Sequence, residues 1–144
     1  MQQGGHMNRN GFTLIEMLIV LVIIGLLAAI AIPKFGNTKE KAYVASMKSD
    51  LRNLMTAEES FYADSLQYTD QTDCANPPAA GAVAWCPSSG NTLQQIDLAK
   101  GQKTGWTAQL SNAHTAVICA IYVGQANPLK PAKNNDPDSV PICQ

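Results

Sequence analysis

The chain is 144 residues long, has a formal net charge of −1 and contains four cysteines. Its near-neutral charge and the lack of a long basic stripe in the sequence argue against nucleic-acid binding as its main role. Aromatic residues make up only 6% of the chain, which argues against a conducting stack of aromatic rings. Once a leader and one apolar segment are set aside, about a hundred residues remain, enough for one small domain.

The first eleven residues are polar, and Arg9 is their only fixed charge. Both Met1 and Met7 are candidate start residues. Arg9 favours a cytoplasmic N-terminus, but lysines at positions 34–41 follow the apolar segment on its other side. Charge alone therefore leaves the orientation in a membrane open.

An unbroken apolar run extends from Met17 to Ile32. Counted from Phe12, the segment is long enough, at about 1.5 Å per helical residue, to cross a bilayer core of about 30 Å. Glu16 is its only charge, and a carboxylate inside a membrane helix costs about 3 kcal/mol even on lenient scales, so it needs a partner. A secretory signal peptide would have a shorter apolar core and would leave Glu16 without a role.

The string Gly-Phe-Thr-Leu-Ile-Glu at positions 11–16, followed by an apolar run that Pro33 closes, resembles the N-terminus of type IV pilins and the related type II secretion pseudopilins. In that family a dedicated peptidase cuts after the glycine on the cytoplasmic side, and the new N-terminal Phe is methylated. The resemblance implies cleavage between Gly11 and Phe12, N-methylation of Phe12, and a role for Glu16 in assembly through the new amino group of Phe12.

The apolar segment contains two weak points for a helix. Pro33 has no N–H and its ring crowds the carbonyl group of Ala29, which predicts a kink or a local opening of the helix. Gly25 has low helix propensity. We therefore expect Gly25–Pro33 to be the compliant part of the helix.

Beyond Pro33 the pattern becomes amphipathic and predicts one long helix from about Phe12 to about Ala63, which Asp64 and Ser65 end. Apolar residues recur at three-, four- and seven-residue steps and predict a face that packs on a sheet: Val44, Met47, Leu51, Leu54, Met55, Phe61 and Tyr62. The remaining helix surface is expected to be polar and comprises Lys39, Lys41, Lys48, Asp50, Arg52, Glu58 and Glu59.

The second half of the chain predicts a small antiparallel sheet between two loops. Residues 70–92 are rich in Pro, Gly, Ala, Asn and Ser and predict irregular structure, and the proline-rich tail from 125 to 144 predicts a second loop, pinned by Cys143. Between them we expect a short strand at Leu93–Leu98, a turn at Lys100–Lys103, and a hairpin of Gly105–Leu110 and Thr115–Val123 across Ser111–His114.

Four cysteines in a small exported domain predict two disulfides, and their spacings differ from paired CxxC zinc ligands. Three connectivities are compatible with the sequence. We favour Cys74–Cys86 and Cys119–Cys143, because each closes a local loop. The second pair also resembles the disulfide-bounded C-terminal region of many type IV pilins. Oxidised cysteines place the head outside the cytoplasm, which fixes the orientation.

Candidate catalytic and metal-binding residues are sparse. His114 lies in a predicted turn and is interpreted as a solvated residue rather than a base or a ligand, and no Ser, Cys or Thr has a recognisable base beside it. Asp136 and Asp138 lie in a loop rich in oxygen ligands and form a weak calcium candidate, but the spacing is not that of an EF-hand loop, and a solvated turn is favoured. We predict no catalytic residue and no cofactor.

The predicted fold class is α+β, with a long N-terminal helix, apolar and then amphipathic, packed on a small antiparallel sheet as in the pilin fold. The predicted division is a leader at 1–11, a membrane and filament-core half-helix at 12–33, and a globular head at 34–144.

The resemblance implies a structural protein and not an enzyme: a type IV pilin processed by a prepilin peptidase and N-methyltransferase and polymerised into a surface filament for adhesion, twitching motility or DNA uptake. Its implied partners are other copies of itself, an assembly platform and an outer-membrane secretin. The precursor would lie in the inner membrane with its head in the periplasm. The alternative is the major pseudopilin of a type II secretion system, and the two cysteine loops favour the pilin. A monomeric membrane-anchored binding module would not need Glu16.

Overall fold

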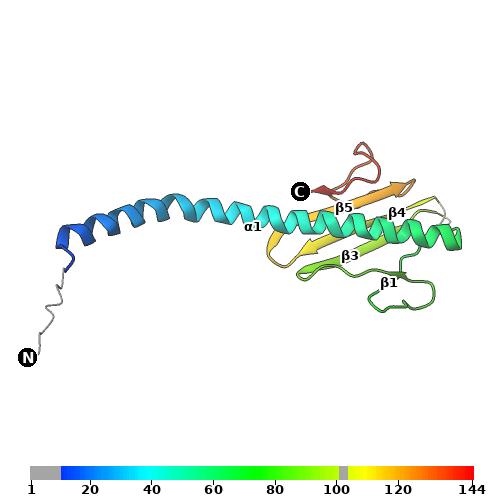
Figure 1. Ribbon diagram of the computed structural model, residues 1–144. Helices are drawn as coiled ribbons and strands as arrows, with labels where there is room; N and C mark the ends of the chain where they lie inside the picture. Colours follow the sequence, from blue (N-terminus) through cyan, green and yellow to red (C-terminus); the bar gives the residue numbers. More distant parts are fainter. Residues whose placement is uncertain (1–10, 101–103) are drawn as a thin grey trace, which may run out of the picture. The chain divides into compact units, whose positions relative to one another are not determined.

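The computed structural model describes residues 11–100 and 104–144 (Figure 1). It contains one long helix, α1 (Leu14–Ser65), followed by six strands. The chain divides into two compact units that meet between Thr38 and Lys39, so α1 contributes its first part to one unit and its second part to the other. The strands are β1 (Thr72–Asp73), β2 (Val83–Ala84), β3 (Asn91–Leu98), β4 (Gly105–Asn112), β5 (Thr115–Gly124) and β6 (Ile142–Cys143).

Helix α1 lies close to the predicted bounds. Its backbone stays helical through position 33, and the compliance of Gly25–Pro33 stays a prediction. After Ser65 the chain leaves the helix through Leu66, whose φ of 56° is left-handed and whose N–H still donates to the Tyr62 carbonyl at 2.8 Å. A left-handed residue directly after a helix is a common way to end it, although glycine is more usual there.

Strands β3 to β6 form an antiparallel sheet in sequence order. Strands β4 and β5 make the predicted hairpin, but Ser111 and Asn112 still belong to β4, so only Ala113 and His114 form the turn. Strand β3 covers the predicted Leu93–Leu98 and begins two residues earlier. Residues 101–103 of the predicted turn lie outside the described residues.

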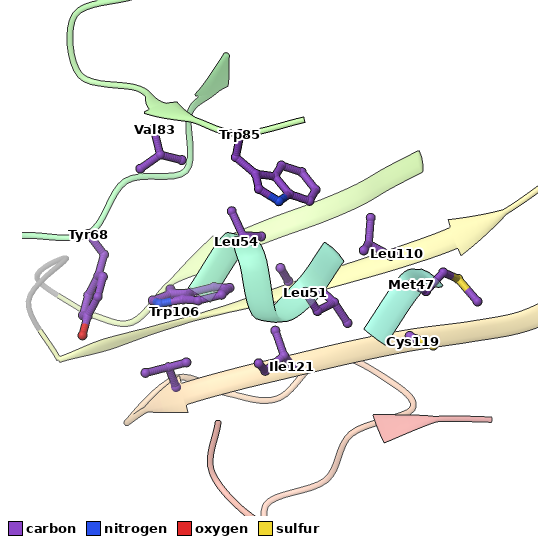
Figure 2. Close-up of a cluster of buried hydrophobic side chains, with 12 residues drawn as sticks. Met47, Leu51, Leu54, Tyr68, Val83, Trp85, Trp106, Leu110, Cys119 and Ile121 are labelled. Atoms are coloured by element: carbon purple, nitrogen blue, oxygen red, sulfur yellow. The ribbon is translucent and has the colours of Figure 1, made fainter. Parts of the chain in front are cut away.

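Between Lys39 and Ser65, α1 covers one face of this sheet, and the contact is the core of the head (Figures 1 and 2). Met47, Leu51 and Leu54 are fully buried, which confirms the predicted apolar face of the helix. They pack in one cluster with side chains of the sheet and of the loop before it: Trp106, Ala108, Leu110, Cys119, Ile121, Val123, Tyr68, Val83 and Trp85.

The two loops are tied to this core. Residues 70–90 are irregular as predicted, except for a short parallel pairing of β1 with β2. The tail returns to the sheet as β6, where Cys143 lies opposite Cys119 of β5. The structure contains the disulfides Cys74–Cys86 and Cys119–Cys143, the pairing that the sequence analysis favours.

Candidate assembly site

The beginning of α1 places Glu16 beside Thr13. Residues 11–13 precede the helix, which starts at Leu14. The backbone N–H and the hydroxyl of Thr13 donate to Glu16 Oε2 at 3.0 and 2.9 Å, and the Glu16 N–H donates to Thr13 Oγ1 at 3.3 Å. This reciprocal arrangement is a capping box, in which two side chains satisfy N–H groups that the first helical turn leaves without partners.

Thr13 is a site residue that the sequence analysis missed. The signal was present, because Thr-x-x-Glu before an apolar run is the signature of a capping box. In the uncut chain Phe12 is joined to Gly11 by a peptide bond and has no free amino group, so pairing of Glu16 with the Phe12 amine stays a prediction. The capping box gives the carboxylate a partner until that amine exists.

Among the described residues, none packs against either glycine of the predicted site. A Cβ atom added to Gly11 or to Gly25 would meet no described atom within 4 Å. The packing of the described residues therefore does not explain a glycine at either position, whereas close approach of another molecule or a flexible backbone would.

The helix that follows the capping box exposes its apolar side chains. Among the described residues, Leu14–Ile32 is a helical stretch long and apolar enough to cross a membrane, and none of it is buried in this chain. Phe12 is 77% exposed, and Val20, at 48%, is still about half exposed. Apolar surface of this extent indicates different surroundings, such as lipid or the helices of other copies.

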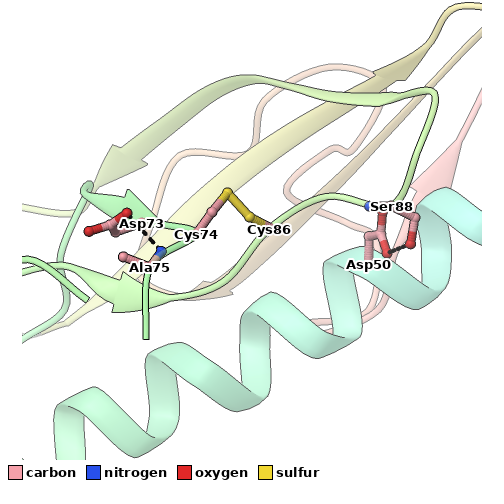
Figure 3. Close-up of a disulfide and its surroundings, with 6 residues drawn as sticks. All are labelled: Asp50, Asp73, Cys74, Ala75, Cys86 and Ser88. Atoms are coloured by element: carbon pink, nitrogen blue, oxygen red, sulfur yellow. Dashed lines mark hydrogen bonds between the residues drawn. A yellow bond between two sulfur atoms is a disulfide. The ribbon is translucent and has the colours of Figure 1, made fainter. Parts of the chain in front are cut away.

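In the head, Asp50 is buried in a polar network, which corrects its assignment to the polar remainder of the helix surface. Its carboxyl group lies against Ser88 (Figure 3). The Ser88 N–H and hydroxyl each donate to its carboxyl oxygens at 2.7 Å, and Asn91 Nδ2 donates to Oδ2 at 2.7 Å. Asn112 Nδ2 in turn donates to Asn91 Oδ1 at 2.6 Å. The network joins α1 to the end of the loop and to strands β3 and β4.

Glu58 is also buried, which corrects its assignment to the polar remainder of the helix surface. Its Oε2 atom accepts a hydrogen bond from the Thr69 N–H at 3.2 Å, and Oε1 has no partner among the described residues. Burial, with a smaller contribution from the negative charges of Glu59 and Asp70, raises the pKa of Glu58 to about 7 against the opposing effect of the Thr69 hydrogen bond.

Tyr68, which directly precedes Thr69, holds the same end of the loop. Its ring stacks on that of Tyr62 with centroids 4.7 Å apart, and its hydroxyl donates to Glu59 Oε1 at 3.0 Å. Burial and this hydrogen bond raise the pKa of Tyr68 to about 12.

The weak calcium candidates serve as hydrogen-bond acceptors in the tail. Asp136 Oδ2 accepts from the Lys133 N–H at 2.8 Å, and both carboxyl oxygens of Asp138 accept from the Gly124 N–H at 3.2 Å. Within the part of the chain that the structure describes, no three His, Cys, Asp or Glu side chains lie together as a metal site. His114 is exposed in its turn, and its ring contacts Tyr43, with centroids 5.3 Å apart.

Comparison with known proteins agrees with these features. Residues 6–32 match the model of the prokaryotic N-terminal methylation motif. The chain is 40% identical over 82 residues (57% of this chain) to the type IV major pilin of Myxococcus xanthus and 42% identical over 62 residues (43%) to a type IV major fimbrial protein of Dichelobacter nodosus. It is 38% identical over 99 residues (59%) to the type II secretion system core protein G of Pectobacterium carotovorum. These matches cover 34%, 40% and 63% of the respective relatives. No solved structure matches the chain significantly.

The methylation motif and the long apolar helix ahead of a helix-on-sheet head define the class of type IV pilin-like proteins. The chain is similar to members of this class, both type IV pilins and type II secretion core proteins. Its relatives carry the names of pilins, fimbrial proteins and a secretion-system core protein, not of enzymes, in agreement with the prediction that it is not an enzyme.

Proposed function

We propose that this chain is a structural subunit of a type IV pilus. It is cut between Gly11 and Phe12, methylated on Phe12 and polymerised through its apolar helix. The observation that carries the proposal is that none of the apolar Leu14–Ile32 stretch is buried in this chain, whereas the head has its own buried core. Such a helix must be covered by lipid in the precursor and by neighbouring copies in a filament.

In the assembly step, the Glu16 carboxylate exchanges its local partner, Thr13, for the Phe12 amino group of a neighbouring subunit. Cleavage creates a positive amino group at Phe12, and an uncompensated charge in an apolar filament core is expensive. A neighbouring subunit in the right register brings its Phe12 amine to the Glu16 carboxylate, and a subunit out of register leaves both groups unpaired. The apolar helices supply most of the attraction, and the charge pair sets the axial step.

The proposed location follows from the same features. The precursor lies in the inner membrane with its disulfide-bonded head in the periplasm, because disulfides form outside the cytoplasm. Its partners are the prepilin peptidase and methyltransferase, an assembly platform, a secretin and other copies of itself, and the product is an extracellular filament.

A second candidate function is that of a type II secretion pseudopilin. The match to core protein G of Pectobacterium carotovorum extends over 99 residues, more than either match to a pilin or fimbrial protein described above. Two disulfides in the head favour the pilus. Electron microscopy of sheared cell surfaces separates the two, because long filaments made of this chain support the pilus, and their absence together with a loss of protein export on deletion supports the pseudopilus.

The charge-pairing step is tested with Glu16→Gln, which keeps the shape and removes the charge. We expect normal cleavage, seen as a mature band, and at least a tenfold loss of sheared filaments. The control is Glu40→Gln on the exposed part of the same helix, which should leave the filament yield unchanged. Filaments of normal number and length from the Glu16 variant would refute the step.

The cleavage step is tested at Gly11. The absence of any described atom near its added Cβ means that a bulky residue there should leave the fold of the chain intact. We expect Gly11→Val to accumulate as an uncut precursor in the membrane, identified by the mass of the intact protein. A Gly25→Val variant of the same chemistry should be cut normally, and a mature Gly11→Val protein would exclude the assigned cleavage site.

A further inference from the structure

We propose that Glu58 is a proton-dependent latch that holds the segment after α1, residues 66–71, on the head. When the Glu58 carboxyl group is protonated, residues 66–71 stay packed on the head, and loss of the proton loosens them. The inference concerns the head alone and does not depend on the kind of filament that the chain forms.

The first support is the placement of the side chain. Glu58 follows Leu54 by four residues and Leu51 by seven, which puts it on the face of α1 that packs on the sheet. Leu51, Leu54 and Glu58 are all fully buried. The Thr69 N–H bond to Oε2, at 3.2 Å, joins this face of the helix to the segment that leaves it.

The second support is the shortage of hydrogen-bond donors. Glu58 Oε1 is buried without a partner among the described residues. A buried ionised carboxyl group needs several donors to replace water, whereas the neutral acid needs fewer. With one donor at Oε2, the site suits the neutral form.

The third support is the charge around the site. The described groups that act on Glu58 are Glu59, its neighbour on the helix, and Asp70 on the segment itself, and both are negative when ionised. Tyr68 and Tyr62, whose rings stack, are also titratable groups of this region, and the Tyr68 pKa of about 12 keeps that side chain neutral. The sheet contributes the apolar side chains of the core cluster, including Trp106, whose buried Nε1–H also lacks a described partner (Figure 2).

The consequence is that residues 66–71 open more readily as the pH rises through neutrality. A pKa of about 7 in the closed form, against 4.5 for a free side chain, makes opening more favourable as the pH rises between these values. The expected increase in the opening equilibrium is about tenfold between pH 6 and pH 8. The increase levels off above pH 8, because the carboxyl group is then ionised in both forms.

The test is hydrogen exchange of the full chain in detergent micelles between pH 5 and pH 8, followed at residues 66–71 and corrected for the intrinsic pH dependence of exchange. In the wild type the corrected exchange should rise about tenfold from pH 6 to pH 8. Glu58→Gln resembles the neutral acid and should flatten this rise, and Glu40→Gln, exposed on the same helix, should retain it. A flat wild-type profile, or the same rise in the Glu58 variant, overturns the proposal.

A direct titration covers the case in which Glu58→Gln does not fold. The ¹³C chemical shift of the Glu58 carboxyl group in the wild type, followed with pH, reports its proton directly. A midpoint near pH 7 supports the latch, and a midpoint near 4.5 contradicts it.

Discussion

The loop between helix and sheet is held at its two ends by two buried carboxyl groups of the same helix, and the two attachments differ in kind. Asp50 holds the end of the loop with three donors from Ser88 and Asn91, each at 2.7 Å. Glu58 holds the beginning with one donor, the Thr69 N–H, at 3.2 Å. Equal burial therefore produces a well-satisfied anchor at one end and an under-satisfied one at the other.

This difference indicates that the number of hydrogen-bond donors, and not burial alone, determines whether a buried carboxyl group is held in one conformation or responds to protonation. The donors to the Asp50 carboxyl group are one backbone N–H and two side chains, and they belong to a wider hydrogen-bond network. In this network Asn112 donates to Asn91, and the Trp85 Nε1–H donates to the Asp50 carbonyl oxygen at 3.2 Å. Networks in which every member is satisfied hold one conformation, and partly satisfied sites respond to protonation.

The largest loss of stability is expected from removal of the Asp50 carboxyl group. Asp50→Ala leaves the Ser88 N–H and hydroxyl without an acceptor and leaves Asn91 Nδ2 with only Ser46 Oγ, at 3.0 Å. Each buried group that loses its partner and that water does not reach costs about 1–3 kcal/mol. We expect the free energy of unfolding of the head to fall by about 3–5 kcal/mol, measured by urea denaturation with tryptophan fluorescence. The exposed neighbour Ser49→Ala is the control and should change it by less than about 0.5 kcal/mol.

The disulfides sharpen the comparison, because they too differ in burial. Cys119 is fully buried in the core, whereas Cys74 and Cys86 are exposed in the loop. In the chain-entropy model the bridges contribute about 3.5 and 3 kcal/mol. Replacing Cys119 and Cys143 by Ser also puts a hydroxyl group into the core, so this variant should lose more stability than the Cys74, Cys86 double variant.

Accessibility gives a second readout for the same pair of bridges. Thiol–disulfide exchange requires a thiolate to reach a disulfide sulfur atom. Under mild reduction followed by alkylation, mass spectrometry should find label on Cys74 and Cys86 before Cys119 and Cys143. Equal labelling rates would mean that the tail opens as readily as the loop.

The pH dependence of the free energy of unfolding isolates the contribution of Glu58 from that of the rest of the head. Its pKa is raised from 4.5 to about 7 on folding, so its contribution is fully present below pH 4.5 and is lost as the pH rises through 7. The loss amounts to about 3 kcal/mol between these limits. Urea denaturation at pH 5 and pH 8 should show this slope in the wild type and not in Glu58→Gln.

Asp73 provides an internal reference of opposite sign. The N–H groups of Ala75 and Ala79 donate to its carboxyl group at 3.0 and 2.7 Å and hold its pKa below the usual value (Figure 3). Its contribution is present above pH 3.8 and is lost as the pH falls through its lowered pKa. The two groups therefore act in separate pH windows, and a loss of stability between pH 5 and pH 8 cannot come from Asp73.

The sequence predicts the parts of this molecule that a local pattern determines. Helical periodicity placed Met47, Leu51 and Leu54 in the core, and alternating apolar residues with turn signals located β3, β4 and β5. The two-residue strands β1 and β2 are too short to have a pattern.

The buried carboxyl groups were misplaced because their residue type was weighed above their position. Asp50 lies three residues after Met47 and four before Leu54, and Glu58 lies four after Leu54, so periodicity alone puts both on the buried face. Their partners were not visible in the sequence. Ser88 lies 38 residues beyond Asp50, and only the folded loop brings its donors to the helix.

The smallest effect on stability is expected at the start of α1, where the described hydrogen bonds of Glu16 are local and exposed. Its partner Thr13 lies three residues away, and together they satisfy the N–H groups of the first turn. Thr13→Val keeps the shape and removes the hydroxyl, so one N–H loses its acceptor and Glu16 keeps only the backbone donor. The expected cost is about 1 kcal/mol, confined to the first turn. It should appear as faster amide exchange at residues 14–17 of the precursor in micelles, with no change in the urea midpoint of the head. Thr13→Ser retains the hydroxyl and should exchange like the wild type. If Thr13→Val exchanges no faster than Thr13→Ser, the capping box does not hold the helix start, and Glu16 is free before cleavage.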